Sequence, residues 1–338
     1  MNLSYWEYKT WLSNIDFTVV GSGIVGLNCA LQLQKQHPKA KIVVLEKGLL
    51  PQGASTKNAG FACFGSISEM LSDLKNHTEE EVLQLVQQRW DGIKALRETL
   101  GDAALDFQLH GGHELFLKED KALYDVCAPQ IASVNELLNP VFKGDAFKIT
   151  PNHFGFNGIE QNYITHNFEG QIDTGKMMLG LLQKARANGI SILNGITVTA
   201  FQDGAAAVHI ETNVFSFKSK KLCIATNGFT NDLVKNSVSP ARAQVVITKP
   251  IHKLAIKGTF HLQEGYYYFR NIDDRILLGG GRNLDFKTEE TTAFGTTALV
   301  TNKLEDILRK VILPGVPLEI ENTWSGIMGK KKKKKPIL

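Results

Sequence analysis

The N-terminal part of the chain alternates between short apolar runs and a helical pattern, which predicts a strand, a helix and a second strand. Apolar residues over 17–20 lead into Gly21-Ser22-Gly23-Ile24-Val25-Gly26, and the helical pattern that follows ends at Gln36-His37-Pro38. A second apolar run over 42–45 ends at Glu46. We therefore expect a β–α–β unit that begins with a glycine turn.

Each glycine of this turn meets a separate physical requirement. Gly21 allows the tight turn, Gly23 lets backbone N–H groups approach a pyrophosphate, and Gly26 lets the helix lie close to the strand. Glu46 follows Gly26 by 20 positions, the spacing at which a carboxylate accepts hydrogen bonds from ribose hydroxyls. A carboxylate there disfavours a 2′-phosphate, so the pattern predicts a site for NAD or FAD.

Residues 47–61 are too irregular for a strand and too interrupted for a helix, so they are predicted to form a loop. Small residues, hydroxyls and an amide are concentrated there. Such a loop can wrap closely around a cofactor, with Ser55 and Asn58 available to hydrogen-bond phosphate or ring atoms. A surface linker is the alternative.

Residues 74–169 break this rhythm and predict an inserted α+β domain. A capping box at Thr78-Glu79-Glu80-Glu81 begins an amphipathic helix. Apolar segments on either side of His110-Gly111-Gly112-His113 predict a hairpin. We interpret the two histidines as polar turn residues and predict no metal site, because no carboxylate or cysteine pattern accompanies them.

The β–α rhythm resumes after Asp173 and reaches a buried strand that enters Thr226-Asn227-Gly228. Residues 265–270 and 275–279 then predict two strands around a turn. The candidates for facing a substrate are Tyr266, Tyr268, Arg270 and Arg282. Only half of the residues in an alternating strand face one side, so a packing role is the alternative for each.

Composition narrows the classes of protein that remain. The chain has 338 residues, 43% of them hydrophobic, which can bury a large core in one or two domains. Four scattered cysteines, no apolar leader and no long apolar run predict a cytoplasmic protein without a membrane span. Six lysines at 330–335 account for the net charge of +4; the rest of the chain has 32 basic and 34 acidic residues. We therefore predict no nucleic-acid partner.

Taken together, the motifs resemble the D-amino-acid oxidase and glycine oxidase family of FAD-dependent oxidoreductases, which has the glutathione-reductase-like flavoprotein fold. The resemblance covers nearly the whole chain. It rests on these segments in order: 21–26 with Glu46, 53–60, the helix entry at Asp173, 223–228, Pro240-Ala241-Arg242-Ala243-Gln244-Val245, 279–282 and Trp324-Ser325-Gly326-Ile327-Met328-Gly329.

The resemblance implies an α/β fold in which a Rossmann-like FAD-binding domain carries an inserted α+β substrate domain with an antiparallel sheet. The implied FAD-binding parts are residues 1–73, 170–241 and 320–338, and the substrate domain comprises 74–169 and 242–319. The residues that the matching motifs assign to the cofactor are Gly21, Ser22, Gly23, Ile24, Val25, Gly26, Glu46, Lys47, Ser55, Thr56, Asn58, Ala59, Gly60, Thr226, Asn227, Gly228, Trp324 and Gly326.

The activity that the resemblance implies is oxidation of a C–N bond in a small amine or amino acid, by hydride transfer to FAD and then imine hydrolysis. O2 is the expected electron acceptor, although a dehydrogenase is the alternative, and no acid–base dyad is required. The oligomeric state and covalent attachment of the flavin, for instance through Cys63, stay open.

Two departures from the family pattern affect this hypothesis. Relatives of the glycine oxidase type have an arginine that clamps the substrate carboxylate where this chain has Met328, which favours an amine over an α-amino acid. The loop around Asn58 is more similar to relatives that act on polyamine conjugates.

The family's last turn and helix would follow Gly329, but lysines follow instead, so we expect a frameshifted product that lacks part of its flavin site. A naturally solvated tail is the alternative.

Two further alternatives come from other classes. An NAD(P)-dependent dehydrogenase would need a catalytic histidine or lysine motif that the sequence does not present. A catalytically inactive flavin-binding protein would hold FAD without turnover.

Overall fold

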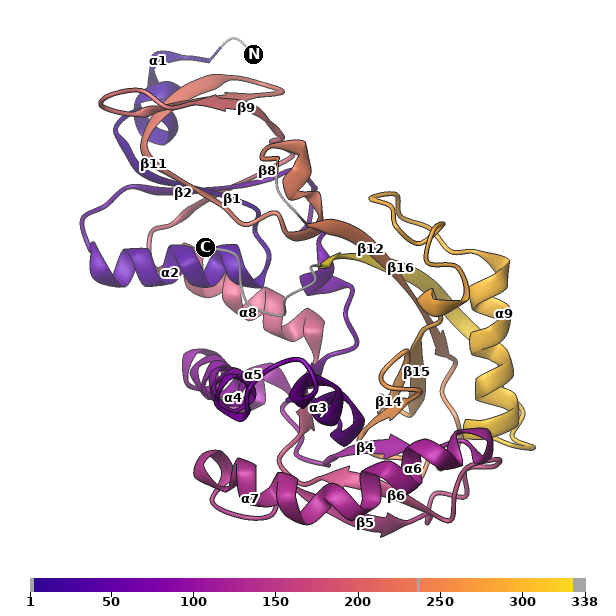
Figure 1. Ribbon diagram of the computed structural model, residues 1–338. Coiled ribbons are helices and arrows are strands. Elements are labelled where there is room, and N and C mark those ends of the chain that lie inside the picture. The colour runs from indigo at the N-terminus through magenta and orange to yellow at the C-terminus, as the bar shows by residue number, and fades with distance from the viewer. Residues whose placement is uncertain (1–2, 236–237, 331–338) are drawn as a thin grey trace.

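The computed structural model describes residues 3–235 and 238–330 (Figure 1). Its α-helices are α1 (Tyr5–Glu7), α2 (Ile24–Gln36), α3 (Ile67–Leu74), α4 (Glu79–Leu100), α5 (Asp102–Leu105), α6 (Lys121–Cys127), α7 (Ile131–Phe142), α8 (Thr174–Ala187) and α9 (Ala298–Ile307). Thr78 caps α4 through the predicted capping box.

A six-stranded sheet forms around the predicted β–α–β unit. Its strands lie in the order β8 (Ser191–Asn194), β2 (Ile42–Glu46), β1 (Ile15–Val20), β11 (Ser216–Ile224), β10 (Val208–Thr212) and β9 (Val198–Gln202). The first four are parallel, and β10 and β9 are antiparallel additions. Helices α2 and α8 pack against one face through a core that includes Val19, Leu27 and Leu181 (Figure 1).

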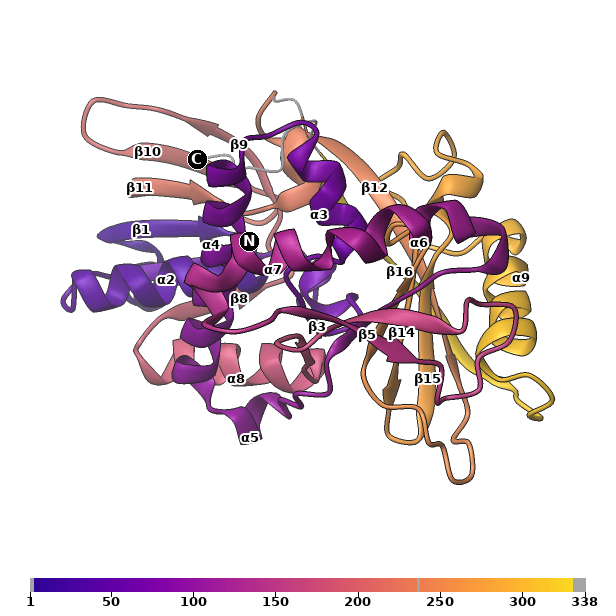
Figure 2. The same cartoon turned by 60° about the horizontal axis from the view of Figure 1, so that its bottom comes forward.

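An eight-stranded, mainly antiparallel sheet curves away from the first (Figures 1 and 2). Its order is β16 (Ile320–Lys330), β12 (Ser239–Thr248), β15 (Arg275–Gly280), β14 (Tyr267–Ile272), β13 (Thr259–Leu262), β4 (Gly112–Leu115), β6 (Asn162–His166) and β5 (Phe147–Pro151). A small sheet joins β3 (Phe61–Ala62) to β7 (Gly170–Gln171). The predicted α/β fold with an antiparallel second sheet is confirmed.

The eight-stranded sheet has two chemically different faces. One face packs on α9 through a core that includes Val246, Phe260 and Phe269. Partners in register share a face, so the residues opposite one another on the other face form a row across the sheet. That row is Trp324, Val245, Gly279, Tyr268, His261 and Glu114. Ala59 and Phe61 of the predicted cofactor loop pack on this face, which we call the inner face.

Two parts of the structure differ from the sequence prediction. The prediction of a hairpin around residues 110–113 is wrong, because β4 pairs with β13 and β6, and residues 102–105 form a short helix. Residues 320–330, assigned from the sequence to the FAD-binding part, pair along their length with β12 in the second sheet. The predicted lysine tail after residue 330 lies outside the described residues.

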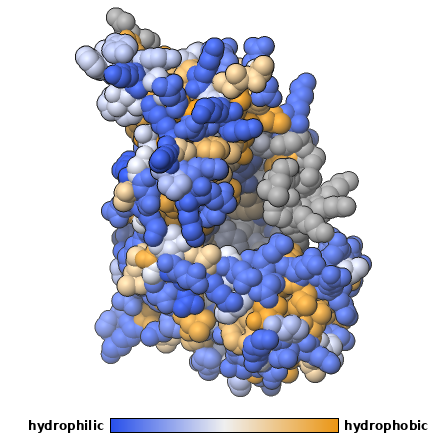
Figure 3. All heavy atoms as spheres, turned by 90° about the vertical axis from the view of Figure 1, so that its left-hand side faces the viewer, coloured by the Kyte–Doolittle hydropathy of each residue, from blue (hydrophilic) through white to orange (hydrophobic). Residues whose placement is uncertain are grey.

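Figure 3 shows a surface on which hydrophilic residues predominate and hydrophobic residues form small separate groups. Within residues 3–235 and 238–330, none of the helices has the length and apolar character needed to cross a bilayer.

Candidate dinucleotide site and the inner face of the second sheet

The glycine turn leaves space that no other residue could provide. Gly21 has a φ of +103°, and a Cβ there would lie 2.6 Å from the carbonyl oxygen of Ala225. A Cβ on Gly26 would lie only 1.9 Å from the carbonyl oxygen of Gly21, so α2 can approach β1 only through a glycine. Val25 in the first turn of α2 is 67% exposed, so a ligand can reach the start of this helix from solvent, beside the Ile24 N–H that binds Ser55.

Glu46 ends β2 beside this turn and is 6% exposed. Its Oε2 accepts hydrogen bonds from the backbone N–H and the hydroxyl of Ser22, at 3.1 and 2.8 Å. Its Oε1 accepts from the N–H of Gly48 at 3.0 Å. These bonds fix the carboxylate and still leave lone pairs that can accept from ribose hydroxyls.

The polar side chains of the predicted cofactor loop mostly bind the loop itself. Ser55 Oγ accepts from the N–H of Ile24 at 2.9 Å, which ties the loop to the start of α2. Thr56 donates to Pro51 and Gly53 carbonyls. Asn58 donates to the carbonyls of Ala54 and Ser55 and accepts from the N–H of Gly60. Asn58 therefore shapes the loop.

Two side chains of the second sheet hold this loop from the other side. Arg270 Nη1 donates to the carbonyl oxygens of Ala59, Gly60 and Ile172 at 3.2, 3.0 and 2.6 Å. Trp324 Nε1 donates to the carbonyl of Lys57 at 3.0 Å. These bonds run from the second sheet to Ile172 and to the cofactor loop, so they fix the distance between the loop and the inner face.

The third predicted cofactor segment lies at the end of β11. Thr226 Oγ1 is buried and has no hydrogen-bond partner among the described residues. Asn227 has a left-handed φ of 47° and accepts from the N–H of Gly329 at 3.0 Å. A Cβ on Gly228 would lie 2.9 Å from the carbonyl oxygen of Met328. The turn thus packs directly against the end of β16.

Two further residues predicted to contact the cofactor, Lys47 and Gly326, pack beside these segments. Lys47 Nζ is 3.7 Å from the ring centroid of Phe229. A Cβ on Gly326 would lie 2.8 Å from Lys57 Cβ, so Gly326 packs closely against the cofactor loop. Tyr268 lies on the inner face with its ring 5.8 Å from that of Phe61, and burial raises its pKa to about 12.

Tyr266 and Arg282 are more peripheral candidates. Tyr266 is 39% exposed, and the Arg282 guanidinium lies 4.8 Å from the Phe286 ring centroid. Met328, where the family resemblance predicts an arginine, is 41% exposed.

These features fit a dinucleotide. The turn around Gly21 is a cradle that a Cβ would fill, the start of α2 can be reached from solvent, and the buried hydroxyl of Thr226 needs a partner. The residues of this site could hold the phosphates at α2, a ribose at Glu46 and the rest of the cofactor beneath the loop.

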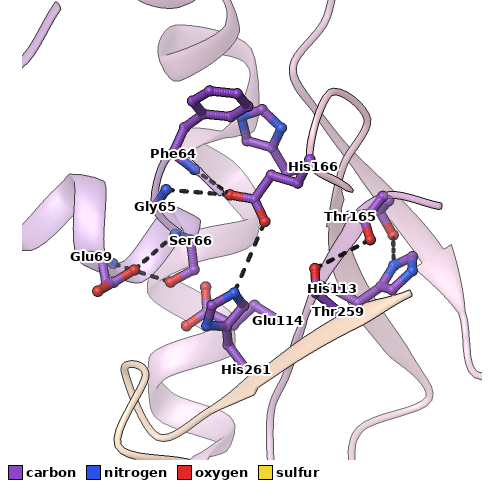
Figure 4. A network of polar contacts seen from close by, with 12 residues as sticks. Phe64, Gly65, Ser66, Glu69, His113, Glu114, Thr165, His166, Thr259 and His261 are labelled. Atoms are coloured by element: carbon purple, nitrogen blue, oxygen red, sulfur yellow. Dashed lines mark hydrogen bonds and ion pairs between the residues drawn. The ribbon is translucent and has the colours of Figure 1, made fainter. Parts of the chain in front are cut away.

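A buried polar cluster adjoins the inner face and was missed by the sequence analysis (Figure 4). Glu169 Oε1 accepts from the N–H groups of Phe64 and Gly65 at 2.8 and 3.3 Å, and its Oε2 lies 3.9 Å from His261 Nε2. Glu114 accepts from the N–H and the hydroxyl of Ser68. The members come from segments that are distant in the sequence, so no local motif identifies them.

Burial shifts the protonation of this cluster. It raises the pKa of Glu114 and that of Glu169 to about 7, although hydrogen bonds from Ser68 and from Phe64 act against it. It lowers the pKa of His113 and that of His166 to about 3.

Among the described residues, no three or more His, Cys, Asp or Glu side chains are grouped so that they could hold a metal ion. This includes His110, His113 and the four cysteines. His113 binds Thr165 Oγ1 through Nδ1 at 2.9 Å. Burial raises the pKa of the Cys63 thiol well above its usual range.

Comparisons with known proteins agree with this geometry. The family model described as DAO, FAD dependent oxidoreductase, matches residues 16–338. A probable oxidoreductase, OrdL, of Rhizobium meliloti (strain 1021) is 25% identical over 334 residues, which cover 93% of this chain and 73% of that protein.

Solved structures show the same fold. Glycine oxidase from Geobacillus kaustophilus superposes with a TM-score of 0.72 at 18% identity and covers 96% of this chain and 85% of its own. Iminodiacetate oxidase from Chelativorans sp. BNC1 has a TM-score of 0.72 at 16% identity and covers 95% and 85%. With a family match over nearly its whole length, this chain belongs to the DAO family of FAD-dependent oxidoreductases.

Proposed function

We propose that this enzyme oxidises the C–N bond of a small amine. In this proposal a hydride passes to FAD, the resulting imine hydrolyses in water, and O2 accepts the electrons. The observation that carries the choice of an amine is that Arg270, the buried arginine on the inner face, is already committed to the protein's own backbone. Arg270 Nη1 donates to the carbonyls of Ala59, Gly60 and Ile172. The buried Arg242 lies on the opposite face of β12, in phase with Val246, and pairs with Glu289 at 2.8 Å. Met328 offers no cation to a substrate carboxylate.

When bound, FAD supplies the hydride acceptor. The residues of the chain would contribute binding and order. The N-terminus of α2 would hold the phosphates, Glu46 a ribose, and the Thr226 hydroxyl would donate to or accept from the cofactor. Arg270 and Trp324 would keep the loop at a fixed distance from the inner face, and Phe61 and Tyr268 would exclude water from the reacting carbon.

The free state of all four cysteines is consistent with a reducing compartment, and we propose a cytoplasmic location. The NAD(P)-dependent alternative is set aside, because the family to which the chain belongs depends on FAD.

The test is anaerobic bleaching of the flavin absorbance by a panel of compounds. The panel contains primary and secondary alkylamines, diamines, glycine, proline and glycerol 3-phosphate. We expect bleaching by at least one amine, with release of ammonia or a shorter amine and a carbonyl product. Bleaching by glycerol 3-phosphate alone would contradict C–N oxidation, and flavin that no compound bleaches would indicate the inactive flavin-binding alternative.

A further inference from the structure

A carboxylate and an imidazole meet inside the protein at the polar end of the inner-face row. The side chains of His261 and Glu169 are 9% and 1% exposed, and Nε2 and Oε2 are 3.9 Å apart. That distance is too long for a hydrogen bond. Among residues 3–235 and 238–330, His261 Nε2 has no hydrogen-bond partner. A buried polar atom without a partner is costly, so this nitrogen is suited to bond with a ligand.

The imidazole of His261 lies close to the cofactor loop. His261 is in register with Tyr268 on one side and with Glu114 on the other, so the three share the inner face. The ring centroids of His261 and Phe61 are 5.2 Å apart, and Phe61 directly follows Gly60. One aromatic ring therefore lies between the imidazole and the backbone of the loop.

The structure holds Glu169 in one orientation. Its Oε1 is fixed by two backbone N–H groups, and its Oε2 is directed toward His261 (Figure 4). A Cβ on Gly112 would lie 1.7 Å from Oε2, so a glycine is needed there to admit the carboxylate. This arrangement positions a carboxylate beside an imidazole without a direct hydrogen bond between them.

Burial and the neighbouring charges act on the pKa of each member of the pair in opposite directions. Burial lowers the pKa of His261, and the neighbouring Glu69 acts in the opposite direction. Burial raises the pKa of Glu169 to about 7, and Arg89 lowers it. The other titratable groups that act on or face the pair are Glu114, His166, Cys63, Tyr268 and, from the other face of β4, His113.

We propose that His261 is the base that removes the proton from the substrate's ammonium group, and that Glu169 is its positioning residue. This inference rests on the proposed amine oxidation. An alkylammonium with a pKa of about 10 is protonated at neutral pH. The nitrogen lone pair must be free before the neighbouring carbon can lose a hydride, since that lone pair stabilises the cation that forms.

The N–H bond of the ammonium breaks, its proton forms a bond to His261 Nε2, and its electron pair stays on nitrogen. Bound FAD would supply the acceptor for the hydride of the neighbouring carbon, and the freed lone pair would form the second C–N bond of an iminium. The imidazolium that remains is stabilised by the carboxylate of Glu169 at 3.9 Å.

The first test compares His261→Asn with His113→Asn. His113 is a matched control, because it is a buried histidine on the neighbouring strand whose side chain faces away from the inner face. Flavin bleaching by an amine found with the panel is followed anaerobically from pH 6 to pH 10, on protein of equal FAD content. We expect the rate of His261→Asn at pH 7 to be lower by about 10²-fold, the usual contribution of a general base. The loss should shrink at high pH, where the amine is deprotonated in water.

A wild-type rate and pH profile in His261→Asn would overturn the assignment while leaving amine oxidation intact. An equal loss in His113→Asn would also overturn it, since the effect would then be structural. If no amine bleaches the wild-type flavin, the proposed function fails and the base fails with it.

A second readout needs no turnover. In protein with ¹³C-labelled histidine, the His261 signal is identified by its absence in His261→Asn, and its titration midpoint is compared between wild type and Glu169→Gln. We expect a lower midpoint in Glu169→Gln, because the carboxylate that stabilises the imidazolium is gone. An unchanged midpoint would overturn the role of Glu169.

Discussion

The substitution Arg270→Met tests whether Arg270 holds the cofactor loop or faces the substrate. Arg270 is 3% exposed, and its Nη1 reaches the carbonyls of Ala59, Gly60 and Ile172. Two of these bonds, to Gly60 and Ile172, are 3.0 Å or shorter. A buried carbonyl that loses its donor costs about 1–3 kcal/mol.

The cost is partly offset because the substitution also removes a buried charge. Burial lowers the pKa of Arg270 to about 10, even though nearby carboxylates, Asp173 first among them, raise it. The guanidinium is therefore stabilised in the folded state less well than in water. We expect the free energy of unfolding to fall by about 2–4 kcal/mol.

The assay is urea unfolding of Arg270→Met without added FAD, together with the Kd for FAD from flavin fluorescence quenching. We expect weaker FAD binding, because the Ala59–Gly60 backbone loses its anchor. Arg282→Met is the control, since the aromatic ring of Phe286 is the contact found for its guanidinium among the described residues. It should change the unfolding free energy by less than about 1 kcal/mol. Wild-type stability and FAD affinity in Arg270→Met, combined with weaker substrate binding, would refute the anchoring role.

Three other substitutions have defined outcomes. Gly26→Ala introduces a Cβ that would lie 1.9 Å from a backbone oxygen, so FAD titration should show a Kd raised about 100-fold or more. The control is Gly92→Ala inside α4, where a Cβ meets nothing within 4 Å, and it should bind FAD normally. Trp324→Phe removes the donor to Lys57 and should lower the midpoint of thermal unfolding by a few degrees, about 1 kcal/mol; an unchanged midpoint would show that the bond contributes nothing. In wild type the folded-state pKa of Glu114 is raised from 4.5 to about 7, so folding takes up a proton there and stability is lost as pH rises through that window. Relative to wild type, Glu114→Gln should therefore become more stable in urea as pH rises from about 4.5 to about 7, and a pH-independent difference would contradict the shift.

The parts of the fold that could be predicted from sequence are those in which neighbouring residues determine the structure. The glycine turn, α2 and Glu46 follow one another in the chain, and their spacing alone predicts the β–α–β unit. The capping box before α4 is equally local.

The buried cluster could not be predicted in this way. His261 meets Glu169 only because β13 pairs with β4, and this register depends on tertiary packing. The same pairing explains the wrong hairpin, since β4 bonds to distant strands and not to the segment before it. The alternation of side chains along a strand does not show which of Tyr266, Tyr268 and Arg270 is free to face a substrate. Arg270 is not free, because it donates to backbone carbonyls of a loop that is remote in sequence.

The most direct test of the central claim is the visible absorption spectrum of the purified protein, followed by the spectrum of the supernatant after acid precipitation. The purified protein should show flavin bands in near-stoichiometric amount, released by acid as FAD, and these bands should be lost in Gly26→Ala but not in Gly92→Ala. A colourless protein that takes up no added FAD, or flavin binding that Gly26→Ala leaves intact, would contradict a dinucleotide site at this turn.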